Sequence, residues 1–173
     1  DVSDDDAPAD APPPPADDRR ARILRMDWDE LATTVAGCTA CPLCRTRTRT
    51  VFGTGDRRAR LMLVGEAPGR DEDLQGEPFV GEAGKLLNEM LRAIGLSRAE
   101  VYIANVLKCR PPGNRDPLPV EIASCRPYLE AQVGFVDPKV VVTLGNFATK
   151  LLLDTKTGIT KLRGQEFPFG GAV

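Results

Sequence analysis

The chain has 173 residues, of which 42% are hydrophobic, so it is long enough to fold as one domain around its own core. No run approaches the roughly 18 consecutive apolar residues of a membrane-spanning helix, and the acidic N-terminus lacks the basic and apolar regions of a secretion signal. The net charge of −2 hides an uneven distribution, because residues 1–18 hold seven Asp and no Lys or Arg, while the remainder has 23 basic and 18 acidic residues. A mildly basic body is compatible with a polyanionic partner, and we expect a cytoplasmic protein without a membrane partner.

Residues 1–27 are predicted to form a disordered, acidic and Pro-rich tail or linker. Their Asp and Pro residues bury too little apolar surface to offset the entropy of ordering the segment. The folded domain is expected to cover residues 28–173. Because the sequence starts without Met and contains no His, we expect it to be a piece of a longer protein.

The body alternates between helical and extended patterns, beginning with a helix for which Asp27 is a candidate N-cap. In chain order, the predicted elements are a helix over 28–36, a strand over 60–64, a helix over 83–94, a strand over 101–107, a helix over 120–136, a strand over 140–144 and a helix over 145–153. Strands separated by helices predict an α/β fold, here a three-layer α/β/α sandwich with a mainly parallel central sheet. In such sheets the loops that follow the strands form the binding crevice. We therefore expect the loops after Val64, Leu107 and Leu144 to converge there.

The cysteines indicate a metal centre. Cys38 and Cys41 form a Cys-x-x-Cys pair, and Cys109 and Cys125 flank the loop that follows the second predicted strand. Cys44 extends the pair to Cys-x-x-Cys-x-x-Cys, but the fourth Cys and following Pro of a ferredoxin pattern are missing, so Cys44 is expected to be a spare thiol. The alternative is that the cysteines are small buried hydrophobes. Spacing alone leaves zinc and iron–sulfur equally open.

The loop after the first predicted strand begins with Gly-Glu-Ala-Pro-Gly over residues 65–69. Its glycines allow backbone N–H groups to approach a ligand closely, although an acidic, solvated loop is an equally simple interpretation. Neither GxGxxG nor GxxxxGK[ST] occurs in the sequence. A nucleotide-cofactor enzyme is therefore disfavoured.

The motifs together resemble the iron–sulfur, thermostable-type uracil-DNA glycosylases of family 4. The resemblance rests on GEAPGRDEDLQGEPFVGEAGKLL (65–87) and NVLKCRPPGNRDP (105–117), with CTAC (38–41) upstream and Cys125 downstream. It runs in order over about residues 31–169. It implies a uracil-DNA glycosylase-like fold and a monofunctional hydrolase that cuts the N-glycosidic bond of flipped-out deoxyuridine in DNA and releases free uracil, starting base-excision repair.

The resemblance also implies one [4Fe–4S] cluster and leaves Cys44 outside it. The implied ligands are Cys38, Cys41, Cys109 and Cys125. The cluster is expected to be structural. We expect a monomer that works on DNA in the nucleoid.

The resemblance assigns the base pocket to a few residues. Phe79 is expected to stack on uracil, and Asn105 to hydrogen-bond uracil O4 and N3 and so reject cytosine. The turn Gly65–Ala67 is expected to contact the base through its backbone, with Glu66 beside it. The alternatives are that Phe79 is core and that Asn105 ties down its own loop.

Cleavage leaves negative charge on uracil and positive character on the sugar, so a carboxylate near the sugar is expected. Related family 1 enzymes place an Asp where this chain has Ala67. Of the neighbouring Asp71, Glu72 and Asp73, we favour Glu72. Glu66 and Asn105 complete the predicted catalytic set.

The family has a His-Pro segment near its C-terminus whose His donates to uracil O2, and this sequence ends before it. We expect a domain incomplete at the C-terminus whose excision is slower by about 100- to 1000-fold, the usual cost of one lost oxyanion donor.

Phosphate contacts are predicted for Lys108, Arg110 and Arg115. Arg45, Arg47 and Arg49 alternate with Thr and predict an exposed stripe. Two other functions remain open: a non-catalytic iron–sulfur uracil-DNA-binding or polymerase-associated module of the same fold, and a zinc-stabilised nucleotide-binding protein.

Overall fold

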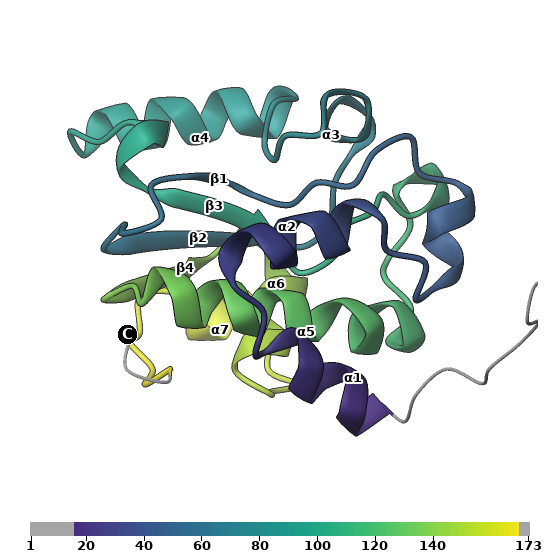
Figure 1. Cartoon of the computed structure of the whole chain (residues 1–173). Helices are drawn as coiled ribbons and strands as arrows, with labels where there is room; N and C mark the ends of the chain where they lie inside the picture. Colours follow the sequence, from purple (N-terminus) through teal and green to yellow (C-terminus); the bar gives the residue numbers. More distant parts are fainter. Residues whose placement is uncertain (1–15, 170–173) are drawn as a thin grey trace, which may run out of the picture.

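The structure, a computed structural model, describes residues 16–169, which form one four-stranded sheet flanked by helices (Figure 1). The strands are β1 (Thr54–Gly55), β2 (Leu61–Gly65), β3 (Tyr102–Asn105) and β4 (Val140–Thr143). The α-helices are α1 (Ala16–Ile23), α2 (Trp28–Ala36), α3 (Arg70–Gln75), α4 (Glu82–Ala93), α5 (Pro119–Val136), α6 (Asn146–Leu152) and α7 (Ile159–Leu162). Short 3-10 helices are η1 (Pro42–Arg45), η2 (Arg98–Glu100) and η3 (Pro112–Asn114).

The sheet order is β1-β3-β2-β4, and the three predicted strands are parallel to one another. The prediction of a mainly parallel sheet is therefore confirmed. The two-residue strand β1, which was not predicted, pairs antiparallel with β3 at the edge. Beyond its last residue, β3 stays beside the β2 loop, because Val106 N donates to Gly65 O at 2.9 Å and Leu107 N donates to Glu66 O at 3.0 Å.

Successive side chains of β2 point to opposite faces of the sheet and enter separate cores. Met62 and Val64 belong to a cluster that includes residues of α5 and α6, whereas Leu63 packs with Leu87 and Leu91 of α4. In Figure 1, α4 lies on one side of the sheet and α5 and α6 lie on the other. The three-layer α/β/α prediction is confirmed.

Local signals explain the helix boundaries that sequence predicted. Asp27 accepts from Glu30 N at 2.9 Å, while the Glu30 side chain accepts from Asp27 N, which completes a capping box at the start of α2. Gly95 has a φ of 75° just after α4, the left-handed conformation that Gly adopts without a steric cost.

The predicted tail over residues 1–27 extends too far into the domain. Residues 16–23 form α1, Ile23 is buried with Tyr128 and Ala131 of α5, and Arg20 pairs with Glu130 at 2.8 Å. The acidic, Pro-rich composition masked a short segment whose Arg and Ile side chains dock on α5. Residues 1–15 lie outside the described part of the chain.

A second difference concerns residues 70–75, predicted as loop. They form α3, because acidic side chains in the first turn suit the positive end of a helix and Gly76, with a φ of 76°, ends it. Within residues 16–169, no helix has the length and apolar character needed to cross a membrane.

Candidate functional site

A pocket of about 300 Å³ lies where β2 and β3 end. Its walls include the loop after β2, the segment that leads into α4, and the loop after β3. Among the lining residues are Glu66, Ala67, Glu72, Phe79, Asn105 and Arg115. Two of the three predicted loops meet here, whereas the loop after Leu144 contributes no residue to the described lining.

Gly65 lets the two principal side chains of the pocket meet. It lies opposite Asn105 in the register of β2 and β3. A Cβ atom at Gly65 would collide with Asn105 Oδ1 and would lie 2.6 Å from Cζ of Phe79. Any larger residue at position 65 would therefore displace one of these side chains.

Asn105 presents an unpaired acceptor. It is 2% exposed, and its Oδ1 has no hydrogen-bond partner among residues 16–169. A buried polar atom without a partner costs about 1–3 kcal/mol, and such exceptions call for an explanation. The loop is held through the main chain instead, since Lys108 Nζ donates to Asn105 O at 2.9 Å. The Oδ1 atom is therefore suited to accept a hydrogen bond from a ligand.

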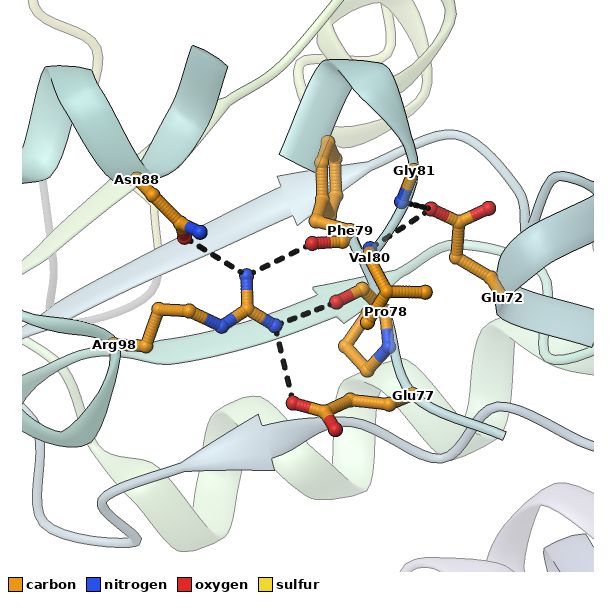
Figure 2. A network of polar contacts seen from close by, with 8 residues as sticks. All are labelled: Glu72, Glu77, Pro78, Phe79, Val80, Gly81, Asn88 and Arg98. Atoms are coloured by element: carbon orange, nitrogen blue, oxygen red, sulfur yellow. Dashed lines mark hydrogen bonds and ion pairs between the residues drawn. The ribbon is translucent and has the colours of Figure 1, made fainter. Parts of the chain in front are cut away.

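The two predicted catalytic carboxylates have different surroundings. Burial, and then the negative charge of Asp116, raise the pKa of Glu66, which lines the pocket. Glu72 also lines the pocket, but its Oε1 accepts from Val80 N and Gly81 N, each at 3.0 Å (Figure 2), and its Oε2 accepts from Gly69 N at 3.1 Å. Glu72 thus joins the turn before α3 to the loop that carries Phe79.

The four predicted metal-binding cysteines come from three segments of the fold. Cys38 and Cys41 lie between α2 and η1, Cys109 follows β3, and Cys125 lies in α5. Cys41, Cys109 and Cys125 are buried in one cluster, and all five cysteines are free thiols. Burial raises the pKa of Cys109 to about 11 and that of Cys125 to about 12, with neighbouring cysteines adding to both shifts.

The four thiols are a donor set for either of the two metal centres that the sequence predicts. Within residues 16–169, no group of three or more His, Cys, Asp or Glu side chains is arranged to hold a single metal ion. A zinc ion needs its thiolates at about 2.3 Å from one point. Thiolates also bind each iron of an iron–sulfur cluster, so the chemistry of this donor set is compatible with both kinds of centre.

Arg47 was predicted to belong to an exposed basic stripe, and this is wrong. Its Nη1 donates to Cys109 Sγ at 3.3 Å and to Cys38 O at 2.7 Å, and the residue is half-buried. Arg45 and Arg49 are exposed as expected. A guanidinium beside a buried sulfur favours the thiolate form that a metal needs.

Lys108 was predicted to contact phosphate, and its burial shows that this is wrong. It is 1% exposed, and its Nζ donates to Gln132 Oε1 at 2.6 Å and to Phe52 O at 3.2 Å, in addition to Asn105 O. Burial lowers the pKa of Lys108 to about 7, while the neighbouring thiols Cys125 and Cys109 oppose this shift. The Lys108 side chain therefore links the segment at Phe52, the end of β3 and α5 through hydrogen bonds inside the fold.

The other two predicted phosphate contacts are accessible. Arg110 is half-buried and its Nε donates to Asn114 Oδ1 at 2.7 Å. Arg115 lines the pocket and makes two hydrogen bonds to the buried carboxylate of Glu121, at 2.6 and 3.0 Å. This pair fixes the guanidinium at the pocket edge and holds the pKa of Glu121 below its usual range.

The sequence reasoning missed Arg98, which binds the loop that carries Phe79. No motif includes Arg98, and its contacts with the Glu77–Phe79 segment join residues 19 to 21 positions apart. No sequence pattern predicts them.

Comparisons with known proteins agree with the geometry. The sequence profile of the Uracil DNA glycosylase superfamily matches residues 52–170. A Type-4 uracil-DNA glycosylase of Archaeoglobus fulgidus is 50% identical over 143 residues, covering 80% of this chain and 72% of the relative. The corresponding protein of Thermotoga maritima is 49% identical, with 79% and 72% covered, and that of Sulfurisphaera tokodaii is 46% identical, with 80% and 66% covered.

The contacts of Glu72 predict a structural contribution. Replacing Glu72 with Ala leaves three backbone N–H groups without their charged acceptor, so the free energy of unfolding should fall by about 2–3 kcal/mol in urea titrations. Glu89→Ala is the control, because the Glu89 side chain is 63% exposed and forms an ion pair with Arg92 on the surface of α4. An equal effect of the two substitutions would contradict the role of Glu72 as a link between loops.

Proposed function

This chain belongs to the uracil-DNA glycosylase superfamily, and we propose that it excises uracil from DNA by hydrolysis of the N-glycosidic bond, starting base-excision repair. The three relatives described above are type-4 enzymes, and the chain spans 66–72% of their length. The observation that carries the proposal is the unpaired Oδ1 of Asn105 inside the pocket.

Asn105 supports selection of uracil. In uracil, N3 carries a proton and O4 is an acceptor, whereas in cytosine N3 is an acceptor and the amino group at C4 is a donor. In the orientation in which Oδ1 accepts from N3–H and Nδ2 donates to O4, a buried amide pairs with uracil and opposes cytosine. A site with a buried polar group rejects a base that leaves the group unpaired far better than a purely apolar pocket does.

Phe79 and the Gly65–Ala67 turn support a flipped-out base. A base in a duplex must leave the stack before an enzyme reaches its glycosidic bond, and a pocket with an aromatic face replaces part of the lost stacking. The ring of Phe79 approaches Gly65 and lines the pocket with Ala67. Contact with the Gly65–Ala67 backbone would hold one edge of the base against this wall.

The chemistry requires charge stabilisation at two places. As the bond between C1′ and N1 breaks, uracil leaves with the bonding electrons and the sugar becomes cationic, after which water adds to C1′ and loses a proton. Glu66 is the pocket carboxylate best placed for this work, because the oxygens of Glu72 already hold three backbone N–H groups. In this assignment Glu66 stabilises the sugar cation and orients the water, while Glu72 orders the loop.

A [4Fe–4S] cluster fits the four cysteines, Cys38, Cys41, Cys109 and Cys125. The donor set is four buried or half-buried free thiols, and the Arg47 guanidinium donates a hydrogen bond to one of them, Cys109 Sγ, at 3.3 Å. When bound, the cluster supplies covalent ties between segments and takes no part in glycosidic cleavage. The cysteines then join the α2–η1 region, the loop after β3 and α5.

Arg110 and Arg115 are proposed to contact DNA phosphates beside the pocket. Both project from the loop after β3, and Arg115 lines the pocket. Lys108 has no part in this contact. We further propose that the protein acts as a monomer on the DNA of the nucleoid in the cytoplasm, since one chain carries the whole described pocket.

The proposal is tested with the complete natural protein and a labelled oligonucleotide that holds one deoxyuridine, with alkaline cleavage as the readout. Asn105→Ala should slow excision by about 100- to 1000-fold, because it removes one group that stabilises the leaving base. Asn146→Ala is the control and should leave the excision rate unchanged, because Asn146 lies in α6 and outside the pocket. Binding of the oligonucleotide without excision by the unmodified protein would favour a non-catalytic binding module.

The raised pKa of Glu66 predicts that the rate of uracil excision depends on pH. Because burial raises its pKa, excision should decline, as the pH falls, at a higher pH than an ordinary Glu would produce. Glu66→Gln should remove this acidic limb and lower the rate at neutral pH. An acidic limb that persists unchanged in Glu66→Gln would show that another group titrates.

The raised pKa of Glu66 also makes the stability of the folded protein depend on pH. A raised carboxyl pKa favours the folded state below the unfolded-state pKa, and this contribution is lost as the pH rises through the folded-state pKa. The Glu66→Gln protein should therefore melt at a slightly higher temperature than the unmodified protein at neutral pH. Glu89→Gln is the control and should change neither this melting temperature nor the acidic limb of the excision rate.

The hydrogen bond from Arg47 to Cys109 predicts that replacing Arg47 changes the properties of the proposed cluster, which can be measured without an activity assay. Arg47→Gln should lower the reduction potential and speed the loss of visible absorbance under oxidation, since hydrogen bonds to the sulfurs tune such clusters. Arg45→Gln is the matched control on an exposed neighbour. Iron and sulfide contents should be measured in both. An unchanged potential and bleaching rate in Arg47→Gln would show that the bond to Cys109 has no influence.

A further inference from the structure

The segment that carries Phe79 is held by side chains on both of its sides (Figure 2). On one side, Arg98 donates from Nη2 to Pro78 O at 2.7 Å and from Nη1 to Phe79 O at 3.0 Å. On the other side, Glu72 accepts from the next two backbone N–H groups, those of Val80 and Gly81. A cation therefore binds two successive carbonyls and an anion binds the two N–H groups that follow.

Arg98 is itself fixed in place. It begins η2, between α4 and β3, and its side chain is 23% exposed. Its Nη2 lies 3.3 Å from Glu77 Oε1, and its Nη1 lies 3.4 Å from Asn88 Oδ1 of α4. Glu77 and Asn88 thus orient the planar guanidinium so that it donates to both carbonyls. The ammonium group of a Lys has no such fixed geometry and would not make the same set of hydrogen bonds.

The backbone that Arg98 holds is in an unfavourable conformation. Phe79 has a φ of 54°, in the left-handed region that bulky residues other than Gly rarely enter. Such conformations persist when the surroundings determine them, and they concentrate at functional sites. Gly84 allows α4 to approach the same place, because a Cβ atom there would collide with the carbonyl of Phe79. That carbonyl is confined between the first turn of α4 and Arg98.

The conformation of Phe79 decides where its ring lies. With this backbone, the ring reaches Gly65 and lines the pocket beside Asn105. In the extended conformation that Phe prefers, the Cα–Cβ bond would point elsewhere and the pocket would lose this wall. Arg98 does not line the pocket. Any influence of Arg98 on a bound base is therefore indirect, and Phe79 is the pocket residue to which Arg98 forms a hydrogen bond.

We propose that Arg98 is a positioning residue for uracil excision, which holds Phe79 in the strained conformation that lets its ring stack on the flipped-out base. The inference rests on the proposed function and adds a residue outside the pocket to it. Arg98 stabilises the stacking platform before the base arrives, so the binding energy of the base is not spent on ordering the loop.

The test compares Arg98→Gln with Arg92→Gln in the complete natural protein. Arg92 lies on the exposed face of α4, pairs with Glu89 and is the matched control. Arg98→Gln should slow single-turnover excision by about 10- to 100-fold, the usual cost of a small misplacement caused from outside the site. It should also weaken inhibition by free uracil by a similar factor. Affinity for an oligonucleotide with an abasic-site analogue, which has no base to stack, should be unchanged.

A double-mutant cycle separates positioning from a general loss of structure. In the Phe79→Ala background there is no ring to position, so Arg98→Gln should change the excision rate by about twofold or less. If Arg98→Gln instead lowers the rate by the same factor with and without the Phe79 ring, the proposal is wrong. It is also wrong if abasic-DNA affinity and uracil inhibition fall together, since a general structural defect moves both.

A second variant guards against misfolding of Arg98→Gln. Gly84→Ala pushes on the Phe79 carbonyl from α4 without replacing Arg98 or any polar side chain of the pocket. It should reproduce the selective loss of uracil binding with abasic-DNA affinity retained, and normal uracil inhibition in a folded Gly84→Ala protein would overturn the inference. Failure of the unmodified protein to excise uracil would overturn the proposed function itself, which distinguishes the two failures.

Discussion

Gly65 ends β2 opposite Asn105, and the volume that a side chain would occupy there is taken by the Asn105 amide and the Phe79 ring. This close approach requires two parallel strands to end in register, a residue without a Cβ atom, and a loop that returns to the strand end. The pocket exists because the three conditions hold together. The loop after β2, α3 and the first turn of α4 keep Phe79 at this point.

Charged side chains near the pocket mainly stabilise backbone. Glu72 holds N–H groups, Arg98 holds carbonyls, and Lys108 holds the carbonyls of Phe52 and Asn105. Each bond satisfies a backbone group that packing has removed from water, where an unpaired partner is costly. Asn105 Oδ1 is the exception among the described pocket residues. Such an unpaired atom beside a well-satisfied framework is typical of a site that completes its hydrogen bonds with a ligand.

Much of the fold could be predicted from local patterns. The apolar run before Gly65 predicts β2, the capping residues at Asp27 predict the start of α2, and strands separated by helices predict the parallel sheet. These features depend on neighbouring residues in the sequence. The segment 16–23 escaped prediction because its helix depends on α5, more than a hundred residues later.

The site was predicted only where a residue belongs to a motif. Phe79 and Asn105 lie in the pocket as expected. Lys108 and Arg47 were predicted to be surface cations. Nothing in the neighbouring sequence indicates that Lys108 donates to Gln132, or Arg47 to Cys109, because these partners lie far away in the chain. Arg98 was missed because its partners are carbonyl oxygens, which every residue has. Tertiary packing decides which carbonyls a side chain meets.

The distribution of the four cysteines has a consequence for biogenesis. Cys38 and Cys41 are among the first residues of the domain to leave the ribosome, whereas Cys125 lies in α5 and follows the whole of β2, α4 and β3. If the four cysteines hold the proposed cluster, its first two ligands are therefore synthesised well before its last one. A cluster with all four ligands could then form only after α5 has been translated, which couples completion of the metal centre to completion of this layer of the fold.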